Sequence, residues 1–284
     1  MRDVWINGAW FPESEARVSV FDRGLLFAQS VYEVVPVLRG RLVNLAHHKA
    51  RLARSLAMAG IADDTDWDAV LAGVVARNDV GEGRVYLQVT GGSAGDRDFL
   101  MPVPAVAPTR IAFSQSAPLV DHPQLAGGLS IVLRDDLRWQ LRAAKTTQLL
   151  YAVLMKEAAR SAGADDAWLV EDGLITEGTS ANAHIIDARG VFVSHPVDRG
   201  VLPGVTRICV LDVVRAMGLP VEERPFTPAE LLSAREAMLS AATALVLPVV
   251  RVDGQAIGDG RPGALTLAIR EAYVARLLQQ VGAG

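Results

Sequence analysis

The stretch LRAAKTTQLLYAVLMKEAARSAGADDAWLVEDGLITEGTSAN, residues 141–182, decides how the rest of this sequence is interpreted. Lys145 stands near its start and Glu177 near its end. The chain holds 28 lysines and arginines, but only Lys49, Lys145 and Lys156 are lysines. Arginine therefore supplies nearly all the fixed positive charge. A retained lysine is a candidate for chemistry, because only lysine loses its proton readily and acts as an amine nucleophile or base.

The surroundings of Lys145 differ from those of the other two lysines. Lys49 and Lys156 lie in charged segments that are typical of a helix surface, whereas Lys145 follows two alanines and precedes two threonines and then leucines. This small and partly apolar setting suits a reactive amine. The alternative is a surface lysine at the start of a helix, and the local sequence does not separate the two interpretations.

The composition limits the class of protein. The chain has 284 residues, of which 50% are hydrophobic and 21% charged, as expected for a soluble folded protein. A net charge of −4 argues against nucleic acid as a partner. Cys209 is the only cysteine, which excludes an intrachain disulfide and a cysteine metal cage.

We expect a cytoplasmic protein with no membrane partner. The start, MRDVWING, lacks the apolar core of a signal peptide. The longest uncharged run, residues 237–250, is too short to cross a bilayer and contains Pro248.

The order of strand-like and helix-like segments predicts an α+β protein of two domains. We place an N-terminal α/β domain at 1–116, an interdomain linker at 117–127 and a C-terminal domain at 128–284. The linker follows from a run with two prolines, two glycines and little periodicity. Asn7-Gly8 predicts a hairpin. The periodicity predicts helices at 46–58, 66–76, 147–162, 205–217 and 265–281, and it gives the helix at 147–162 a buried stripe of Leu150, Val153, Leu154 and Ala158.

Several kinds of site are excluded by the motifs. The chain has no P-loop, no G-x-G-x-x-G, no H-E-x-x-H and no G-x-S-x-G. Only His47 and His48 are close in sequence, and neighbours on a helix point in different directions, so we predict no metal site. What remains is a candidate lysine, an acid near a glycine, and loops suited to a phosphate.

Three segments carry a resemblance: KTTQLL from Lys145, TEGTSAN from Thr176 and LPGVTR from Leu202. Together they resemble the class IV aminotransferases, which are pyridoxal-phosphate enzymes of fold type IV, and most of all the D-amino-acid transaminases. The resemblance extends from FDRG at Phe21 to LPVV at Leu247. It implies a smaller N-terminal α/β lobe, a larger C-terminal pseudo-barrel lobe that binds pyridoxal 5′-phosphate, and a homodimer.

The resemblance assigns Lys145 and Glu177 to the binding of the cofactor. Lys145 would form a Schiff base with the cofactor aldehyde and then move a proton during catalysis. Glu177 would accept a hydrogen bond from the pyridine nitrogen and keep that nitrogen protonated. Without the resemblance, Glu177 would be interpreted as a solvated carboxylate in a turn.

Other residues are assigned to the phosphate and the ring. Arg51 would bind the phosphate, as would the amides of Val205 and Thr206 and the Thr206 hydroxyl at a helix start. Leu202 would pack on the ring face. The alternatives are a surface helix arginine at Arg51 and ordinary helix capping at Thr206.

A third phosphate contact falls in SAATALVLPV. Many family members have a threonine where this chain has Ala242, so only the Ala242 amide is available there. Ser240 or Thr243 would replace it if the turn shifts.

The substrate residues depart from the family pattern. Tyr32 matches a tyrosine that lines the pocket, although a core strand tyrosine is the alternative. Arg97, from the neighbouring subunit, would bind the substrate carboxylate, but Phe99 stands where the family has a histidine. Pro36 replaces a common lysine, and AQS at 28–30 replaces GDG. These changes would also admit a substrate without a carboxylate.

The sequence therefore predicts a pyridoxal-phosphate transaminase. It would act between a D-amino acid such as D-alanine and a 2-oxo acid such as pyruvate or 2-oxoglutarate, by a ping-pong reaction through Lys145. The nearest alternative is an R-selective amine transaminase or a dual activity. Branched-chain aminotransferase, aminodeoxychorismate lyase and a non-catalytic small-molecule-binding protein are further alternatives.

Overall fold

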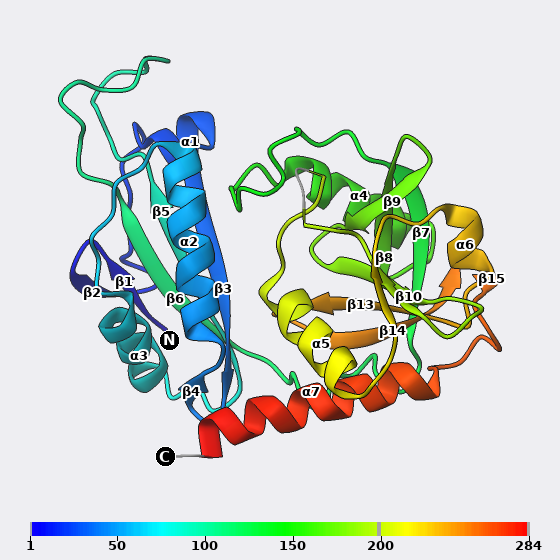
Figure 1. The fold of residues 1–284 in the computed structure, drawn as a ribbon. Helices are drawn as coiled ribbons and strands as arrows, with labels where there is room; N and C mark the ends of the chain where they lie inside the picture. The colour runs from blue at the N-terminus through cyan, green and yellow to red at the C-terminus, as the bar shows by residue number, and fades with distance from the viewer. Residues whose placement is uncertain (1, 198–199, 283–284) are drawn as a thin grey trace. The chain divides into compact units, whose positions relative to one another are not determined.

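The computed structural model describes residues 2–197 and 200–282 and divides the chain into two compact units (Figure 1). The first unit takes in the chain up to Ala117, together with Ala144–Gln148 and the last residues from Gln280. The second takes in Pro118–Ala143 and Leu149–Gln279. The two-unit α+β architecture is as predicted. Lys145 belongs to the first unit, although the chain on both sides of its short segment belongs to the second.

The first unit is an antiparallel sheet with the strand order β2-β1-β6-β5-β3-β4. Asn7 and Gly8 join β1 to β2 with φ values of 50° and 95°, as a tight hairpin turn requires. Helix α2 packs on β3, and α3 packs on β6. The elements are β1 Asp3–Ile6, β2 Ala9–Pro12, α1 Arg23–Phe27, β3 Ser30–Leu38, β4 Arg41–Leu42, α2 Leu45–Ala59, α3 Trp67–Arg77, β5 Gly83–Thr90 and β6 Arg110–Ser116.

The second unit is a mixed sheet with the strand order β12-β11-β10-β13-β14-β7-β8-β9, and β15 pairs with β14. The end strand β9 also lies close to β10, so the sheet curls toward closure. Trp168, Ile185 and Phe226 are fully buried within it. The elements are β7 Leu129–Asp135, α4 Leu150–Ser161, β8 Asp166–Glu171, β9 Leu174–Gly178, β10 Asn182–Ile186, β11 Phe192–Ser194, α5 Val205–Ala216, β12 Val221–Glu223, α6 Pro228–Leu232, β13 Glu236–Ala241, β14 Leu245–Val252, β15 Gln255–Ala256 and α7 Ala264–Gly282.

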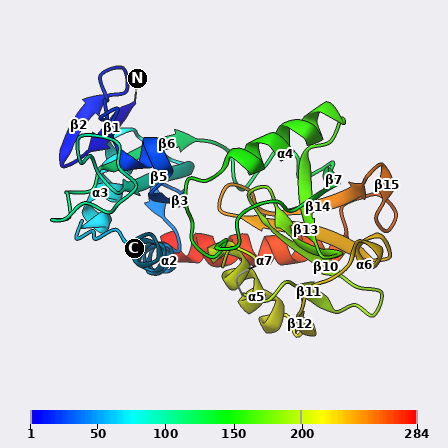
Figure 2. The same cartoon turned by 90° about the horizontal axis from the view of Figure 1, so that it is seen from above.

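The predicted buried stripe of α4 is wrong. Leu150, Val153 and Leu154 are 72%, 60% and 51% exposed, whereas Ala152 and Ala159 are buried. Helix α4 packs on β7 and β8 (Figure 2). Its small alanines face the sheet because they allow a close approach, and the larger apolar side chains are left on the outer face. Periodicity identified which residues share a face of the helix, but not which face is covered.

Local sequence signals set the ends of several helices. Gly60 ends α2 in the left-handed conformation with φ of 65°. Thr227 caps α6 in a reciprocal pair of hydrogen bonds with Glu230. Within the described ranges, none of the helices combines the length and the apolar character that a membrane span needs.

Candidate active site

Lys145 lies in an extended segment beside the start of β3. Its carbonyl accepts a hydrogen bond from the Tyr32 amide at 3.0 Å. Its own amide donates to the Ser55 hydroxyl of α2 at 3.1 Å. Helix α4 begins only at Leu150, so Lys145 is not a lysine in the first turn of a helix. Backbone contacts to two elements of the first unit fix its position.

The ring of Tyr32 faces this lysine. Lys145 Nζ lies 4.1 Å from the Tyr32 ring centroid, a cation–π contact. Tyr32 stacks on Tyr86 at 5.5 Å, and Tyr86 stacks on Phe113 at 4.8 Å between centroids. Burial raises the pKa of Tyr86, so the middle ring of the stack stays uncharged. Tyr32 is only half-buried and holds its ring against the amine, so it is not a core tyrosine.

Arg51 forms a buried ion pair with Glu33 of β3. Arg51 Nε and Nη2 donate to Glu33 Oε1 and Oε2, each at 2.7 Å. His48 Nδ1 lies 2.7 Å from Glu33 Oε2. Burial alone would raise the pKa of Glu33, but the Arg51 charge and the hydrogen bonds outweigh it and lower the pKa to about 2. Arg51 is 4% exposed and is therefore not a surface helix arginine.

Glu33 and His48 were not predicted as site residues from the sequence. In VYEVV, Glu33 looks like the outward-facing polar residue of an alternating strand. The side chain is instead fully buried. Only its spatial neighbour Arg51, eighteen residues later, explains why a carboxylate is tolerated there.

Arg97 lies in the loop between β5 and β6, which projects from the first unit. Its guanidinium packs on the rings of Phe27 and Phe99, at 5.1 and 4.7 Å from their centroids. The buried Arg23 holds this loop, because its Nη1 donates to the Asp98 carbonyl at 2.7 Å. Phe99, where the family pattern expects a histidine, therefore contributes an aromatic face to Arg97 and no hydrogen-bond donor.

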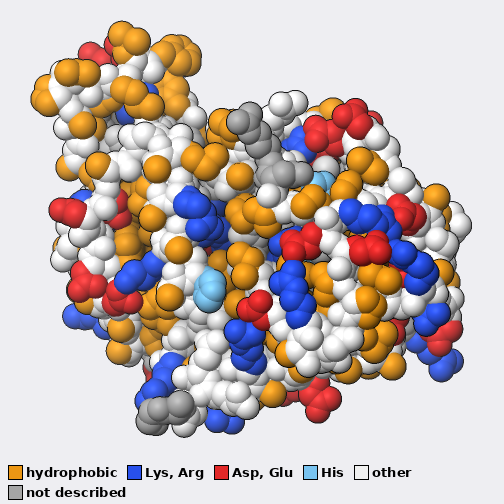
Figure 3. Space-filling model, in the orientation of Figure 1, with side chains coloured by type: hydrophobic (Ala, Val, Ile, Leu, Met, Phe, Trp, Pro, Cys, Tyr) orange, Lys and Arg blue, Asp and Glu red, His pale blue; other side chains and the backbone are white. Residues whose placement is uncertain are grey.

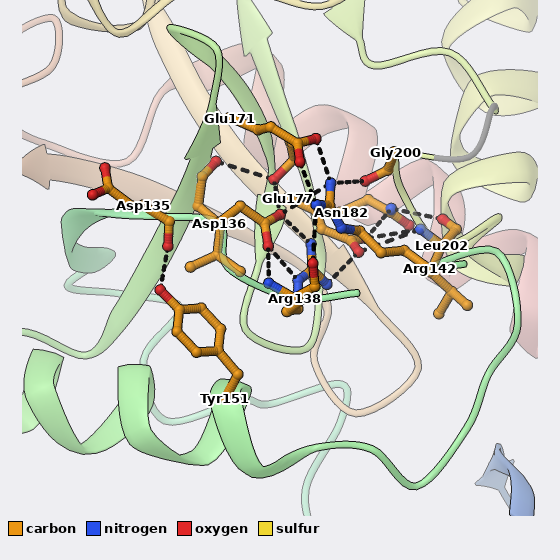
Figure 4. A network of polar contacts seen from close by, with 12 residues as sticks. Asp135, Asp136, Arg138, Arg142, Tyr151, Glu171, Glu177, Asn182, Gly200 and Leu202 are labelled. Atoms are coloured by element: carbon orange, nitrogen blue, oxygen red, sulfur yellow. Dashed lines mark hydrogen bonds and ion pairs between the residues drawn. The ribbon is translucent and has the colours of Figure 1, made fainter. Parts of the chain in front are cut away.

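In the second unit, Glu177 lies at the centre of a polar network (Figure 4). Arg138 Nη1 donates to Glu177 Oε1 at 2.7 Å, and Asn182 Nδ2 donates to Oε2 at 3.0 Å. The Leu202 amide lies 3.3 and 3.2 Å from the two oxygens. Glu177 is 4% exposed and is not a solvated turn carboxylate. Burial raises its pKa, and the Arg138 charge and hydrogen bond oppose that rise.

Arg138 is held by a second carboxylate, that of Asp136. Arg138 Nε donates to Asp136 Oδ1 at 2.9 Å, and Nη2 donates to Oδ2 at 2.7 Å. The Thr176 hydroxyl donates to the same Oδ2 at 2.7 Å. Arg142 pairs with both oxygens of Glu171, at 2.7 and 2.6 Å, and its Nη1 lies 3.4 Å from Asp136 Oδ2. No local signal in RDDLRWQLR distinguishes these charges from a solvated surface.

Helix α5 begins at Val205 behind the N-cap residue Gly204, and no side chain caps it. The first amides of a helix, with the positive end of its dipole, form a ready anion site. Val205 and Thr206 are both buried there. A Cβ on Gly204 would lie 1.9 Å from Asn182 Oδ1, so glycine is required for the helix to start this close to Asn182.

The turn that contains Ala242 connects β13 to β14. The Ser240 hydroxyl lies 2.8 Å from His184 Nε2, and His184 Nδ1 lies 3.0 Å from the Ser194 hydroxyl. Burial, with the charge of Arg207, lowers the pKa of His184 to about 3, so this imidazole is neutral. Ser240 is 2% exposed and its hydroxyl is engaged with His184, so the Ala242 amide, with Thr243 as the alternative, stays the predicted phosphate contact.

The donors and acceptors of the second unit fit pyridoxal phosphate. A carboxylate offers about four acceptor positions, and three donors meet Glu177: Arg138, Asn182 and the Leu202 amide, whose single N–H is shared between both oxygens. One position is left for a ring N–H, and the uncapped start of α5 suits a phosphate. Across residues 2–197 and 200–282, no group of three or more His, Cys, Asp or Glu is placed to hold a metal ion.

The predicted site residues are divided between the two units. Tyr32, Arg51, Arg97 and Lys145 lie in the first, and Glu177, Leu202, Val205, Thr206 and Ala242 lie in the second. Within the first unit, Tyr32 and Lys145 are in contact. Within the second, the Leu202 backbone contacts Glu177. Their roles toward cofactor and substrate stay predictions.

Two of these features are typical of a pyridoxal-phosphate enzyme. One is a lysine amine that faces an aromatic ring, and the other is a buried carboxylate paired with an arginine. The family model of class IV amino-transferases matches residues 30–252. The D-alanine aminotransferase of Bacillus licheniformis is 36% identical over 280 residues, covering 98% of each chain. That of Staphylococcus aureus (strain N315) is 33% identical, covering 96% of this chain and 97% of the relative.

Among solved structures, the branched-chain amino acid aminotransferase from Escherichia coli has a TM-score of 0.87. It is 22% identical, and the match covers 97% of this chain and 94% of that one, which shows the shared fold. The chain therefore belongs to the class IV aminotransferase family, and it is a pyridoxal-phosphate-dependent enzyme.

Proposed function

We propose that this enzyme transfers the amino group between a D-amino acid such as D-alanine and a 2-oxo acid such as pyruvate or 2-oxoglutarate. The observation that carries the proposal is the likeness to D-alanine aminotransferases along 98% of the chain. The reaction would be ping-pong, with each substrate leaving before the next one enters. A cytoplasmic location is part of the proposal.

Bound pyridoxal phosphate supplies an electron sink for the bonds broken at the substrate α-carbon. Lys145 would hold the cofactor through Nζ and would then carry a proton on that nitrogen to and from the substrate carbon. Tyr32 supports this role, because its ring fixes where the amine rests.

The remaining cofactor contacts follow from the chemistry of each group. Glu177 would accept a hydrogen bond from the ring nitrogen, and the Leu202 side chain would cover a ring face. Phosphate would be held by Arg51, by the amides of Val205 and Thr206 with the Thr206 hydroxyl, and by the Ala242 amide. Support comes from the buried Glu177 and from a helix start that no side chain caps.

A homodimer is part of the proposal, in which the Arg97 loop of a second copy closes each site and binds the substrate carboxylate beside Tyr32. Two apolar surfaces support it, since large apolar patches on proteins usually mark interfaces. One is the projecting loop, where Leu100 and Val103 are 75% and 95% exposed (Figure 3). The other is the outer face of α4, which presents Leu150 and Val153.

The second candidate activity is an R-selective amine transaminase, alone or beside the first. The observation that favours it is the Phe27–Arg97–Phe99 contact. An arginine packed beside two aromatic rings, without a histidine next to it, binds a carboxylate less firmly than a two-donor site. The aromatic faces would also accept an apolar group.

A substrate panel tests both activities. The enzyme, loaded with pyridoxal phosphate, is mixed with D- or L-alanine or with R- or S-1-phenylethylamine, and the absorption of the cofactor is followed. We expect D-alanine to convert the cofactor to its amine form and 2-oxoglutarate to restore it. Conversion by the R-amine alone would overturn the amino-acid assignment and favour the second candidate.

Lysine variants give the matched control. Lys145→Ala should abolish conversion, because no other amine replaces its Nζ. Lys156→Ala removes a half-exposed lysine that pairs with Asp166, and it should convert at the wild-type rate. Unchanged conversion by the Lys145 variant would exclude the assigned role.

A further inference from the structure

The proposed chemistry uses Glu177 but leaves its neighbour Arg138 without a role. Arg138 lies between two buried carboxylates (Figure 4): Nη1 binds Glu177, and Nε with Nη2 bind Asp136. The exposed fractions of the side chains are 15% for Arg138, 5% for Glu177 and 0% for Asp136. One guanidinium thus divides its hydrogen bonds between Glu177, which is expected at the cofactor, and Asp136, which holds the guanidinium from its other side.

We propose that Arg138, fixed in place by Asp136, keeps Glu177 ionised and thereby keeps the proton they share on the ring nitrogen of the bound cofactor. This inference rests on the proposed function, because it requires Glu177 to meet that nitrogen. Arg138 acts through Glu177 and is a positioning residue.

Two arrangements of the shared proton compete. Either the carboxylate is charged and the nitrogen protonated, or the carboxyl is neutral and the nitrogen is bare. Burial disfavours the separated charges, and burial also raises the pKa of Glu177 in this network. A guanidinium 2.7 Å from Oε1 stabilises the charged carboxylate and so favours the protonated nitrogen. Only a protonated nitrogen serves as a strong electron sink.

Asp136 should affect the position of the shared proton in the opposite direction from Arg138. Its charge attracts the same guanidinium and weakens the pull of Arg138 on Glu177. The charged groups around Glu177 are Arg138 and Asp136, while Arg142 and Glu171 pair with each other one step further out. Removing Arg138 and removing Asp136 should therefore move the shared proton in opposite directions, which loss of packing alone would not do.

The direct readout is the ¹⁵N chemical shift of the pyridine nitrogen in enzyme loaded with ¹⁵N-labelled cofactor, recorded as a function of pH. We expect the wild-type nitrogen to be protonated at neutral pH. Arg138→Met should lower the pH at which that nitrogen loses its proton, and Asp136→Asn should raise it. Arg138→Lys keeps the charge but loses the paired contacts, so its midpoint should lie between those of wild type and Arg138→Met.

Arg138→Met leaves the buried Asp136 with the Thr176 hydroxyl and the more distant Arg142 as its remaining side-chain partners, and it can fail to fold. The double variant Asp136→Asn/Arg138→Met removes both charges, and its nitrogen should lose its proton early, as in the single methionine variant. Arg251→Met, at an exposed arginine outside this network, should match wild type. A midpoint in the double variant equal to wild type would overturn the inference.

Kinetics give a second readout. Arg138→Lys and the double variant should lose about 10- to 100-fold in kcat, the range expected for one charge-assisted hydrogen bond, with KM for the amino acid little changed. If wild-type enzyme gave no signal from the labelled cofactor, that result would instead reject the proposed function. A normal signal and turnover in wild type with unchanged variants would reject only the role of Arg138.

Discussion

Two buried carboxylates, Glu33 in the first unit and Glu177 in the second, have the same kind of partner and opposite behaviour. Each is paired with an arginine at 2.7 Å. Arg51 gives Glu33 two hydrogen bonds and His48 adds a third contact, and the pKa of Glu33 falls to about 2. Arg138 gives Glu177 only one, because Asp136 takes the rest of its guanidinium, and the pKa of Glu177 is raised.

Each carboxylate has at least three hydrogen-bond contacts, so the difference lies in how much of an arginine charge each one receives and not in the number of donors. Burial penalises both charges. Glu33 receives two hydrogen bonds from the Arg51 guanidinium, which outweigh that penalty and suit it to holding structure. Glu177 shares the Arg138 guanidinium with Asp136, so burial dominates and its pKa is raised.

The largest expected effect on stability comes from removing the charge of Glu33, whose two oxygens both accept hydrogen bonds from Arg51. Glu33→Gln leaves the buried Arg51 charge without its anion, so we expect a loss of about 3–5 kcal/mol in the free energy of unfolding. Urea denaturation followed by circular dichroism measures it. Glu13→Gln, which removes an exposed partner of Arg2, should leave the curve in place. A Glu33 variant as stable as wild type would show that this pair is not structural.

Acid should reduce the stability difference between wild type and Glu33→Gln. The pKa of Glu33 is about 2 in the folded chain against an ordinary 4.5, so its contribution is complete above pH 4.5 and is lost as the pH falls toward 2. At 1.36 kcal/mol per pKa unit, the difference should shrink by at most about 3 kcal/mol across that window. Urea curves of both proteins at pH 5, 4 and 3 give the values. A difference that does not change with pH would contradict the assignment.

The same substitution at Glu177 should lower turnover while leaving stability nearly unchanged. Glu177→Gln should change the free energy of unfolding by less than about 1 kcal/mol, since Arg138 keeps Asp136 and burial already disfavours the charge. Turnover should fall about 10- to 100-fold with cofactor still bound, because an amide does not keep the ring nitrogen protonated. Full turnover in this variant would remove the role proposed for Glu177.

The last test concerns the support that Glu177 receives from the side of α5, where we expect a smaller effect on turnover than in Glu177→Gln. In Gly204→Ala the new Cβ would lie 1.9 Å from Asn182 Oδ1, and Asn182 donates to Glu177. We expect a loss of about 1–3 kcal/mol from overpacking, together with slower turnover. Gly127→Ala, where a Cβ meets nothing within 4 Å, is the matched control. Equal stability and turnover in the two variants would show that Asn182 moves aside freely.

Much of the fold could be predicted because its signals are local. Asn7-Gly8 forms the β1–β2 turn, Gly60 ends α2, and Thr227 caps α6, each through contacts with residues a few positions away. The outward face of α4 could not be predicted, since Leu150 and Ala152 differ in burial only through what packs on the helix.

The candidate site could likewise be predicted only in part from the sequence. Lys145 was found because lysine is scarce in the chain, and Glu177 because of its motif. Tyr32 was predicted to line the pocket, but its contact with Lys145 was not predicted, and Arg138 was not predicted at all. Tyr32 meets Lys145 across 113 residues of chain, and Arg138 meets Glu177 across 39. No periodicity within either segment contains that information.

The sequence by itself determined the class of fold, the identity of the chemical groups and the ends of several helices, because these depend on residue types and near neighbours. The tertiary structure alone decided which arginine neutralises which carboxylate and by how many hydrogen bonds. The physical reason is that a buried charge takes its pKa from groups within a few ångströms, and strand register and helix packing bring those groups together from distant parts of the chain.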